Sequence, residues 1–165
     1  MIARVAAPLR ASVAKLAVIG DEEAATLLNA EAIDDAPGLR QGPLSGIASA
    51  LIWAAREGAA WIAIAPCDTP LLPRNFVTRF HEAATNSGAA IVCARTGDGV
   101  HPLVSLWSVD VSLALSSALA ADSYPAAHSF IAECGAAYVT FPNMALMNVN
   151  TLADLEIVRA HIERR

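Results

Sequence analysis

The chain has 165 residues and a formal net charge of −5 at pH 7, which points to a single domain over residues 1–165 that can bury one sizeable core. Its Lys and Arg residues are scattered, which argues against a nucleic-acid partner. With no apolar run of membrane-spanning length and no recognisable signal peptide, we expect a cytoplasmic protein without a membrane partner. The cysteines Cys67, Cys93 and Cys134 form no CxxC pair, which argues against a disulfide framework or a zinc site.

Helical and strand-like segments alternate along the chain. Apolar residues at helical spacing predict helices over 2–16, 44–57, 73–87, 109–121, 128–134 and 152–162, with a further helical start at 21–23. Short apolar runs predict strands over 16–20, 32–33, 61–65, 89–94, 102–107 and 136–141. This order predicts an α/β fold of three layers, α/β/α, in which helices cover both faces of a mostly parallel sheet.

The predicted strand over 61–65 runs into the proline-bounded turn Pro66-Cys-Asp-Thr-Pro70. In an open α/β sheet, ligands and metals bind outside the carboxyl ends of the strands. Asp68 is therefore a candidate ligand of Mg²⁺, an ion that proteins hold with one or two carboxylates plus phosphate oxygens. The alternative is an ordinary turn, in which an Asp side chain bonds to its own backbone.

A second candidate is the segment Gly42-Pro-Leu-Ser-Gly46, which precedes a predicted helix. Glycines beside a helix start allow a ligand to approach the backbone, and the free amides there can bind an anion or the edge of a base. Alternatively, Gly-Pro only turns the chain and Ser45 caps the helix. The segment lacks the Lys of a Walker loop.

Other polar residues lie where predicted strands begin or end. Asn148 and Asn150 place two amides on one side of an extended turn, where they can contact a base, a bound water or a pterin, or simply cap the next helix. His101 precedes a predicted strand and is either a ligand contact or a loop histidine with an internal partner. Asp34 and Asp35 end a predicted strand and are either nucleotide contacts or solvated loop acids.

Taken together and in this order, four motifs resemble those of the molybdenum cofactor guanylyltransferase family, the MobA-like nucleotidyltransferases. They are Gly42-Pro-Leu-Ser-Gly46, Pro66-Cys-Asp-Thr-Pro70, His101-Pro102 with the following Trp107, and Asn148-Val-Asn-Thr151. Members of the family transfer GMP from GTP to molybdopterin. The resemblance extends over nearly the whole chain and implies a Rossmann-like nucleotidyltransferase fold.

The resemblance also implies roles for individual residues on the nucleotide side of the site. Asp68 matches the catalytic Mg²⁺ ligand, and Mg²⁺ is the only cofactor implied. Asp35 matches an acid that contacts the nucleotide. The Gly-Pro-Leu-x-Gly form of the loop favours GTP over CTP, and its matching nucleotide-binding residues are Gly42, Pro43, Leu44 and Gly46.

On the acceptor side, His101, Asn148 and Asn150 match positions near the metal and the pterin substrate. The resemblance implies GTP and molybdopterin as small-molecule substrates, and molybdoenzymes or their chaperones as recipients of the product. A homo-oligomer is compatible with it.

One family motif has no counterpart in residues 1–165. Family members begin with a strand and a glycine-rich loop, Leu-Ala-Gly-Gly-x-x-x-Arg-Met-Gly-x-x-Lys, which wraps the triphosphate. Met1 aligns within the helix that follows this loop, so we expect an N-terminally truncated form of the fold, with unpaired strand edges beside an apolar surface. Two alternatives follow: a non-catalytic nucleotide-binding or pterin-binding module, or a nucleotidyltransferase that uses CTP or a sugar phosphate.

Overall fold

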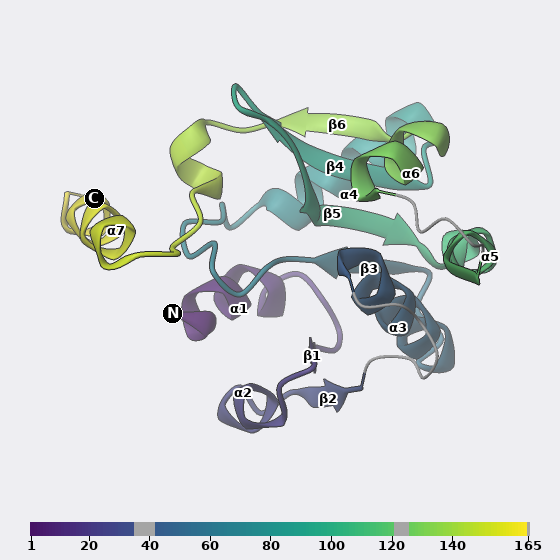
Figure 1. Cartoon of the computed structure of the whole chain (residues 1–165), viewed down its shortest axis with the longest axis horizontal. Helices are drawn as coiled ribbons and strands as arrows, with labels where there is room; N and C mark the ends of the chain where they lie inside the picture. Colours follow the sequence, from purple (N-terminus) through teal and green to yellow (C-terminus); the bar gives the residue numbers. More distant parts are fainter. Residues whose placement is uncertain (35–41, 121–125, 165) are drawn as a thin grey trace.

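The computed structural model describes residues 1–34, 42–120 and 126–164, and its strands form two separate sheets (Figure 1). The smaller sheet pairs β1 (Ala17–Ile19) in parallel with β2 (Glu31–Ile33). The larger sheet has the order β3-β5-β4-β6, with β3 (Trp61–Ile64), β4 (Ile91–Thr96), β5 (Gly99–Ser108) and β6 (Ala137–Thr140).

The larger sheet is mixed, so the prediction of a mostly parallel sheet is wrong for it. Strand β4 pairs in parallel with β6, but β5 runs antiparallel to both β3 and β4. The reason is the connection between β4 and β5, which consists only of Gly97 and Asp98. A parallel pair requires a crossover of a dozen or more residues, whereas a two-residue loop makes an antiparallel hairpin. His101 therefore lies inside β5 and not before it.

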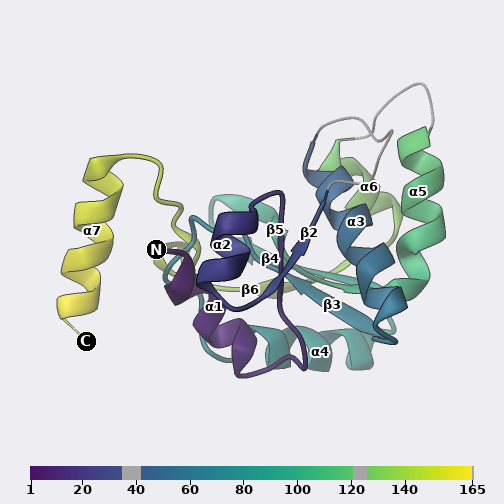
Figure 2. The same ribbon diagram turned by 90° about the horizontal axis from the view of Figure 1, so that it is seen from below.

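Helices cover both faces of the larger sheet, as Figure 2 shows: α3 and α5 lie on one side of it and α4 on the other. The helices are α1 (Ile2–Arg10), α2 (Glu22–Leu27), α3 (Pro43–Arg56), α4 (Phe76–Ser87), α5 (Ser112–Ala120), α6 (Ala127–Glu133) and α7 (Leu152–Glu163), with the 3₁₀ helices η1 (Val109–Val111) and η2 (Asn143–Leu146). The first helix ends well before the predicted residue 16, two residues after Pro8. In the part of the chain that the structure describes, every helix is too short or too polar to reach across a lipid bilayer.

Two hydrophobic clusters fill the space between the layers. Alternate residues of β4 point to opposite faces: Ile91 and Cys93 pack with α3, α5 and α6, whereas Val92 and Ala94 pack with α1, α4 and η2. Trp107 of β5 is fully buried on the first face. The alternation follows from the two-residue period of a strand. The predicted three-layer α/β/α architecture is therefore confirmed.

A cavity of about 540 Å³ separates the two sheets. Among the described strands, β1 pairs only with β2, and β3 pairs only with β5, so one edge of each faces this space. Mostly apolar side chains of α1, β1, α3 and β3 line the cavity. One of them is Trp53, whose buried Nε1 has no hydrogen-bond partner among the described residues. The expectation of unpaired strand edges beside an apolar surface is thus confirmed.

Candidate functional site

Asp68 lies four residues after the end of β3, in a turn that is tied to a distant part of the chain. The buried hydroxyl Oγ1 of Thr69 donates a hydrogen bond to Oδ1 of Asn148 at 2.9 Å, and it lies 3.4 Å from Oδ1 of Asp68. The backbone N–H of Val149 donates to the carbonyl oxygen of Asp68 at 2.8 Å. The structure therefore brings Asp68 and Asn148 together, with Thr69 between them.

Asn150 has a different setting from Asn148. Its backbone N–H donates to Oδ2 of Asp154 at 3.1 Å, which makes it part of the start of α7. Thr151 is the N-cap of this helix and forms a capping box with Asp154. Hydrogen bonds from the Thr151 side chain and from the backbone N–H groups of Asn150 and Thr151 lower the pKa of Asp154. The described contacts of Asn150 are thus those of helix capping.

The segment 42–46 forms the start of α3. Gly42 is the N-cap with φ of 154°, a conformation that residues with a side chain rarely adopt, and Pro43 follows as the first helical residue. The hydroxyl of Ser45 donates to the carbonyl oxygen of Gly42 at 2.6 Å. Leu44 as a whole has no exposed surface, so this arrangement offers a ligand no contact with it.

The start of α3 lies at the same end of the sheet as Asp68. Residues 57–60 join the end of α3 to the beginning of β3, so the end of the helix lies near the start of the strand and the start of the helix lies toward the strand's carboxyl end. The positive dipole end of this long helix favours a bound anion. Its first residues offer few N–H donors, because Pro43 has no N–H and that of Ser45 donates to the carbonyl oxygen of Gly42 at 3.1 Å. Asp35, predicted to contact the nucleotide, lies outside the described residues.

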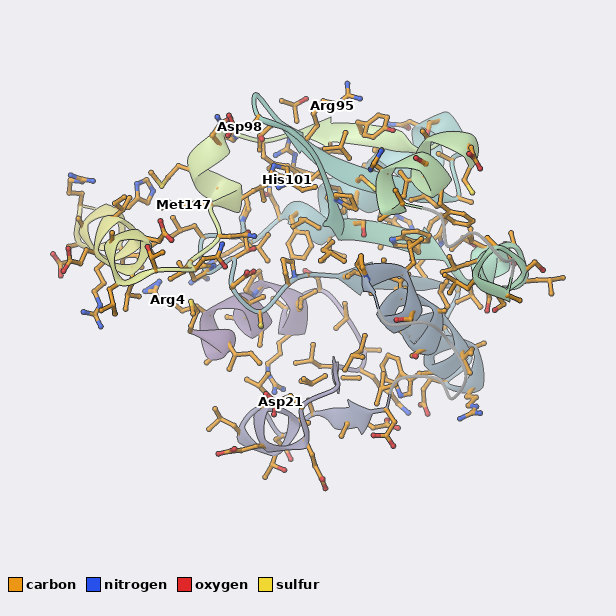
Figure 3. All side chains as sticks on the ribbon, viewed as in Figure 1. Arg4, Asp21, Arg95, Asp98, His101 and Met147 are labelled. Carbon is orange, nitrogen blue, oxygen red and sulfur yellow. The ribbon has the colours of Figure 1, made fainter. Side chains whose placement is uncertain are left out.

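A second cavity, of about 350 Å³, opens beside Asn148. Figure 3 labels three residues around it, Asp98, His101 and Met147, which come from the β4–β5 hairpin and the segment after η2. Oγ1 of Thr96 and Nε2 of His101 share a hydrogen bond of 2.8 Å, which fixes the imidazole from β4. The full lining is Asp98, His101, Asn143, Met144, Leu146, Met147 and Asn148.

Sequence reasoning missed two residues of this region. Thr69 lies inside the predicted turn motif, but its contact with Asn148 joins residues 79 positions apart, which no local pattern indicates. Asp98 lies between the predicted strands 89–94 and 102–107 with a glycine on either side, which is a signal for a tight hairpin.

The donor atoms near Asp68 suit a hard divalent ion bound together with phosphate. The site offers one carboxylate, one hydroxyl and one amide oxygen, all of them oxygen ligands. In residues 1–34, 42–120 and 126–164, no three His, Cys, Asp or Glu side chains cluster in a way that could hold a metal by themselves. These residues therefore fit Mg²⁺ or Mn²⁺ with nucleotide oxygens as further ligands.

The cysteine beside Asp68 offers a chemical probe of the site. Cys67 is exposed, whereas burial raises the pKa of Cys93 to about 12 and, with the neighbouring Glu133, raises that of Cys134. Because the thiolate is the reactive form, iodoacetamide at pH 8 should modify Cys67 first. Peptide mass spectrometry after timed labelling measures this. Equal labelling of Cys93 in the folded protein would contradict the buried position of that thiol.

Comparison of the sequence with known proteins identifies one family and several similar proteins. The family model described as "MobA-like NTP transferase domain" matches residues 1–137. A protein of Nitrobacter hamburgensis named molybdenum cofactor guanylyltransferase is 35% identical over 119 residues, covering 69% of this chain and 57% of that protein. One of the same name from Acidiphilium cryptum is 31% identical over 147 residues, covering 88% of this chain and 71% of that protein.

Solved structures share the fold at lower identity. Molybdopterin-guanine dinucleotide biosynthesis protein A from Archaeoglobus fulgidus has a TM-score of 0.67 and 18% identity, over 90% of this chain and 79% of that one. The chain spans less than three fifths of the Nitrobacter relative, at 57% of its length.

Proposed function

The chain belongs to the MobA-like NTP transferase domain family, and on that premise we propose that it transfers GMP from GTP to molybdopterin in the presence of Mg²⁺. The observation that carries the proposal is the junction of Asp68, Thr69 and Asn148 at the carboxyl end of β3. Through this junction the carboxylate of Asp68, which suits a divalent ion, lies next to the 350 Å³ cavity lined by Asn148, which suits an acceptor substrate. A cytoplasmic location is part of the proposal, because the free thiols of Cys67, Cys93 and Cys134 fit a reducing compartment.

Each part of the proposed site has a separate task. The start of α3, where Gly42 and Pro43 are exposed, lies against the nucleotide, and the positive dipole end of the helix favours its phosphates. Asp68 holds the divalent ion, which when bound offsets negative charge on the phosphate oxygens. Thr69 and Asn148 keep the turn that carries Asp68 in place.

The proposed reaction is one displacement at phosphorus. A phosphate oxygen of the pterin substrate forms a bond to the α-phosphorus of GTP, and the bond from that phosphorus to the oxygen that bridges to the β-phosphate breaks, releasing pyrophosphate. The phosphate nucleophile is already an anion, so the protein has to position the two substrates and offset their charge. This agrees with a site built around Asp68, to which no side-chain nucleophile needs to be added.

The same site supports a second candidate function, nucleotide or pterin binding without turnover. The observation that favours it is that the hydrogen bonds described around Asp68, Thr69 and Asn148 involve no Lys or Arg side chain. Among the described residues of the proposed site, the metal that Asp68 would hold and the start of α3 are the groups that offset the charge of a triphosphate.

Incubation of the purified chain with α-³²P-GTP, Mg²⁺ and molybdopterin tests the proposal. Labelled product, and pyrophosphate in equal amount, is the expected result, with CTP at least about 10-fold poorer as donor if the segment 42–46 selects guanine. Preference for CTP would point to a cytidylyl donor. Binding of pterin and GTP with no labelled product would establish the binding module instead.

A further inference from the structure

We propose that Asp98 selects the acceptor substrate: its carboxylate accepts hydrogen bonds from the ring N–H and the 2-amino group of a pterin held in the 350 Å³ cavity. The inference rests on the proposed function and goes beyond it by naming a residue that reads the heterocycle. The ring edge of a pterin donates two parallel hydrogen bonds, and an ionised carboxylate is the side chain that accepts both at once.

The hairpin that carries Asp98 is fixed against η2. The backbone N–H of Gly97 donates to Oδ1 of Asn143 at 2.9 Å, and the N–H of Asp98 donates to Oγ1 of Thr96 at 3.3 Å. A Cβ added at Gly97 would lie 3.2 Å from Oδ1 of Asn143, so the close approach of the hairpin to η2 favours glycine. Asp98 is thus held on a preformed wall of the cavity, as selective recognition requires.

The remaining lining suits a flat heterocycle. Met144 and Met147 supply thioether side chains, which are polarizable and make favourable contacts with aromatic rings. Among the described residues, none donates a hydrogen bond to the Asp98 carboxylate, so both of its oxygens are available to a ligand. His101 and Asn148 add polar groups along the same cavity.

The position of the cavity separates pterin from guanine, which has the same donor edge. Asn148 belongs both to the cavity and to the Asp68 junction, so an acceptor with its phosphate near Asp68 can reach Asp98 with its ring. The helix η2, which frames the cavity, packs on one face of the sheet, and α3 packs on the opposite face. Because α3 carries the proposed nucleotide loop, we assign the Asp98 cavity to the pterin.

The test compares two ring systems that differ at one group. 6-Hydroxymethylpterin carries the 2-amino donor, and 6-hydroxymethyllumazine carries a carbonyl oxygen in its place; both are fluorescent, so binding is measured directly. The wild-type chain should bind the pterin at least about 10-fold more tightly than the lumazine. In Asp98→Asn, pterin affinity should fall about 10-fold and the preference should disappear, with GTP affinity unchanged.

A matched control is Glu82→Gln, which removes a carboxylate on the exposed surface of α4 and should alter neither affinity. Undiminished pterin preference in Asp98→Asn would overturn the inference, as would a wild-type chain that binds neither ring. Loss of GTP affinity without loss of pterin affinity would mean that Asp98 reads guanine, and this too would overturn it. A chain that selects pterin through Asp98 but transfers no GMP would disprove the proposed function and uphold the inference.

Discussion

Replacing Asp68 by alanine should lower the affinity for GTP in the presence of Mg²⁺ by at least about 100-fold and abolish GMP transfer. Loss of a residue that only orients a metal ligand typically costs 10- to 100-fold in metal affinity, so loss of the ligand itself should cost at least the upper value. Because the carbonyl oxygen of Asp68 also accepts from Val149, and alanine keeps this backbone bond, the turn should persist. Isothermal titration with GTP, with Mg²⁺ and with EDTA, measures the effect.

Two further variants make this result specific. Thr69→Val removes the hydroxyl that reaches Asn148 but leaves the carboxylate, and it should weaken GTP binding far less than Asp68→Ala does. Glu82→Ala removes an exposed carboxylate remote in sequence from the turn and should leave binding unchanged. If Asp68→Ala bound Mg²⁺ and GTP as tightly as the wild-type chain, Asp68 would not be the metal ligand.

The largest loss of stability is expected for Trp107→Ala. The indole of Trp107 is fully buried, lies stacked on Phe130 with ring centroids 6.2 Å apart, and donates from Nε1 to Oγ of Ser105 at 2.7 Å. Truncation of a buried Trp to Ala typically costs about 3–5 kcal/mol, through lost burial and the cavity left behind. For a chain of this length the midpoint of thermal unfolding should fall on the order of 10 °C.

Trp61→Ala is the matched control for Trp107→Ala. Trp61 belongs to β3, the edge strand of the larger sheet, and its partly buried side chain lines the 540 Å³ cavity. Its truncation should therefore lower the free energy of unfolding clearly less than truncation of Trp107 does. Urea unfolding of both variants, followed by circular dichroism, gives the two free energies of unfolding. Equal losses at Trp61 and Trp107 would contradict the account of the core.

The order of helices and strands follows from periodicity, but the directions of the strands do not. The apolar runs at 61–65, 89–94 and 102–107 predict β3, β4 and β5 because buried strands read as short apolar segments. The reversal of β5 depends on the length of one connection, and residues 95–96 and 99–101, which form no apolar run, conceal how short it is. They belong to the strands, because Arg95 pairs with Val100 and Thr96 with Gly99.

The part of the site that the sequence predicts is the part identified by the order of several motifs along the chain. Asp68 and Asn148 were predicted as neighbours only through the family resemblance, and their link through Thr69 depends on tertiary structure. Asp98 was not predicted, because its position against η2 follows from the hairpin and from the contact between Gly97 and Asn143. Local patterns report turns and helix caps well, and they report side-chain groups assembled across the sheet poorly.

The most direct test of the central claim is a crystal structure of the chain with Mn²⁺ and GTP, in which anomalous scattering locates the ion. The account predicts an anomalous peak about 2.1 Å from a carboxylate oxygen of Asp68. The ion at this peak should also contact phosphate oxygens of a nucleotide that lies toward the start of α3. Bound nucleotide with its ion away from Asp68, or with its phosphates remote from the start of α3, would contradict it.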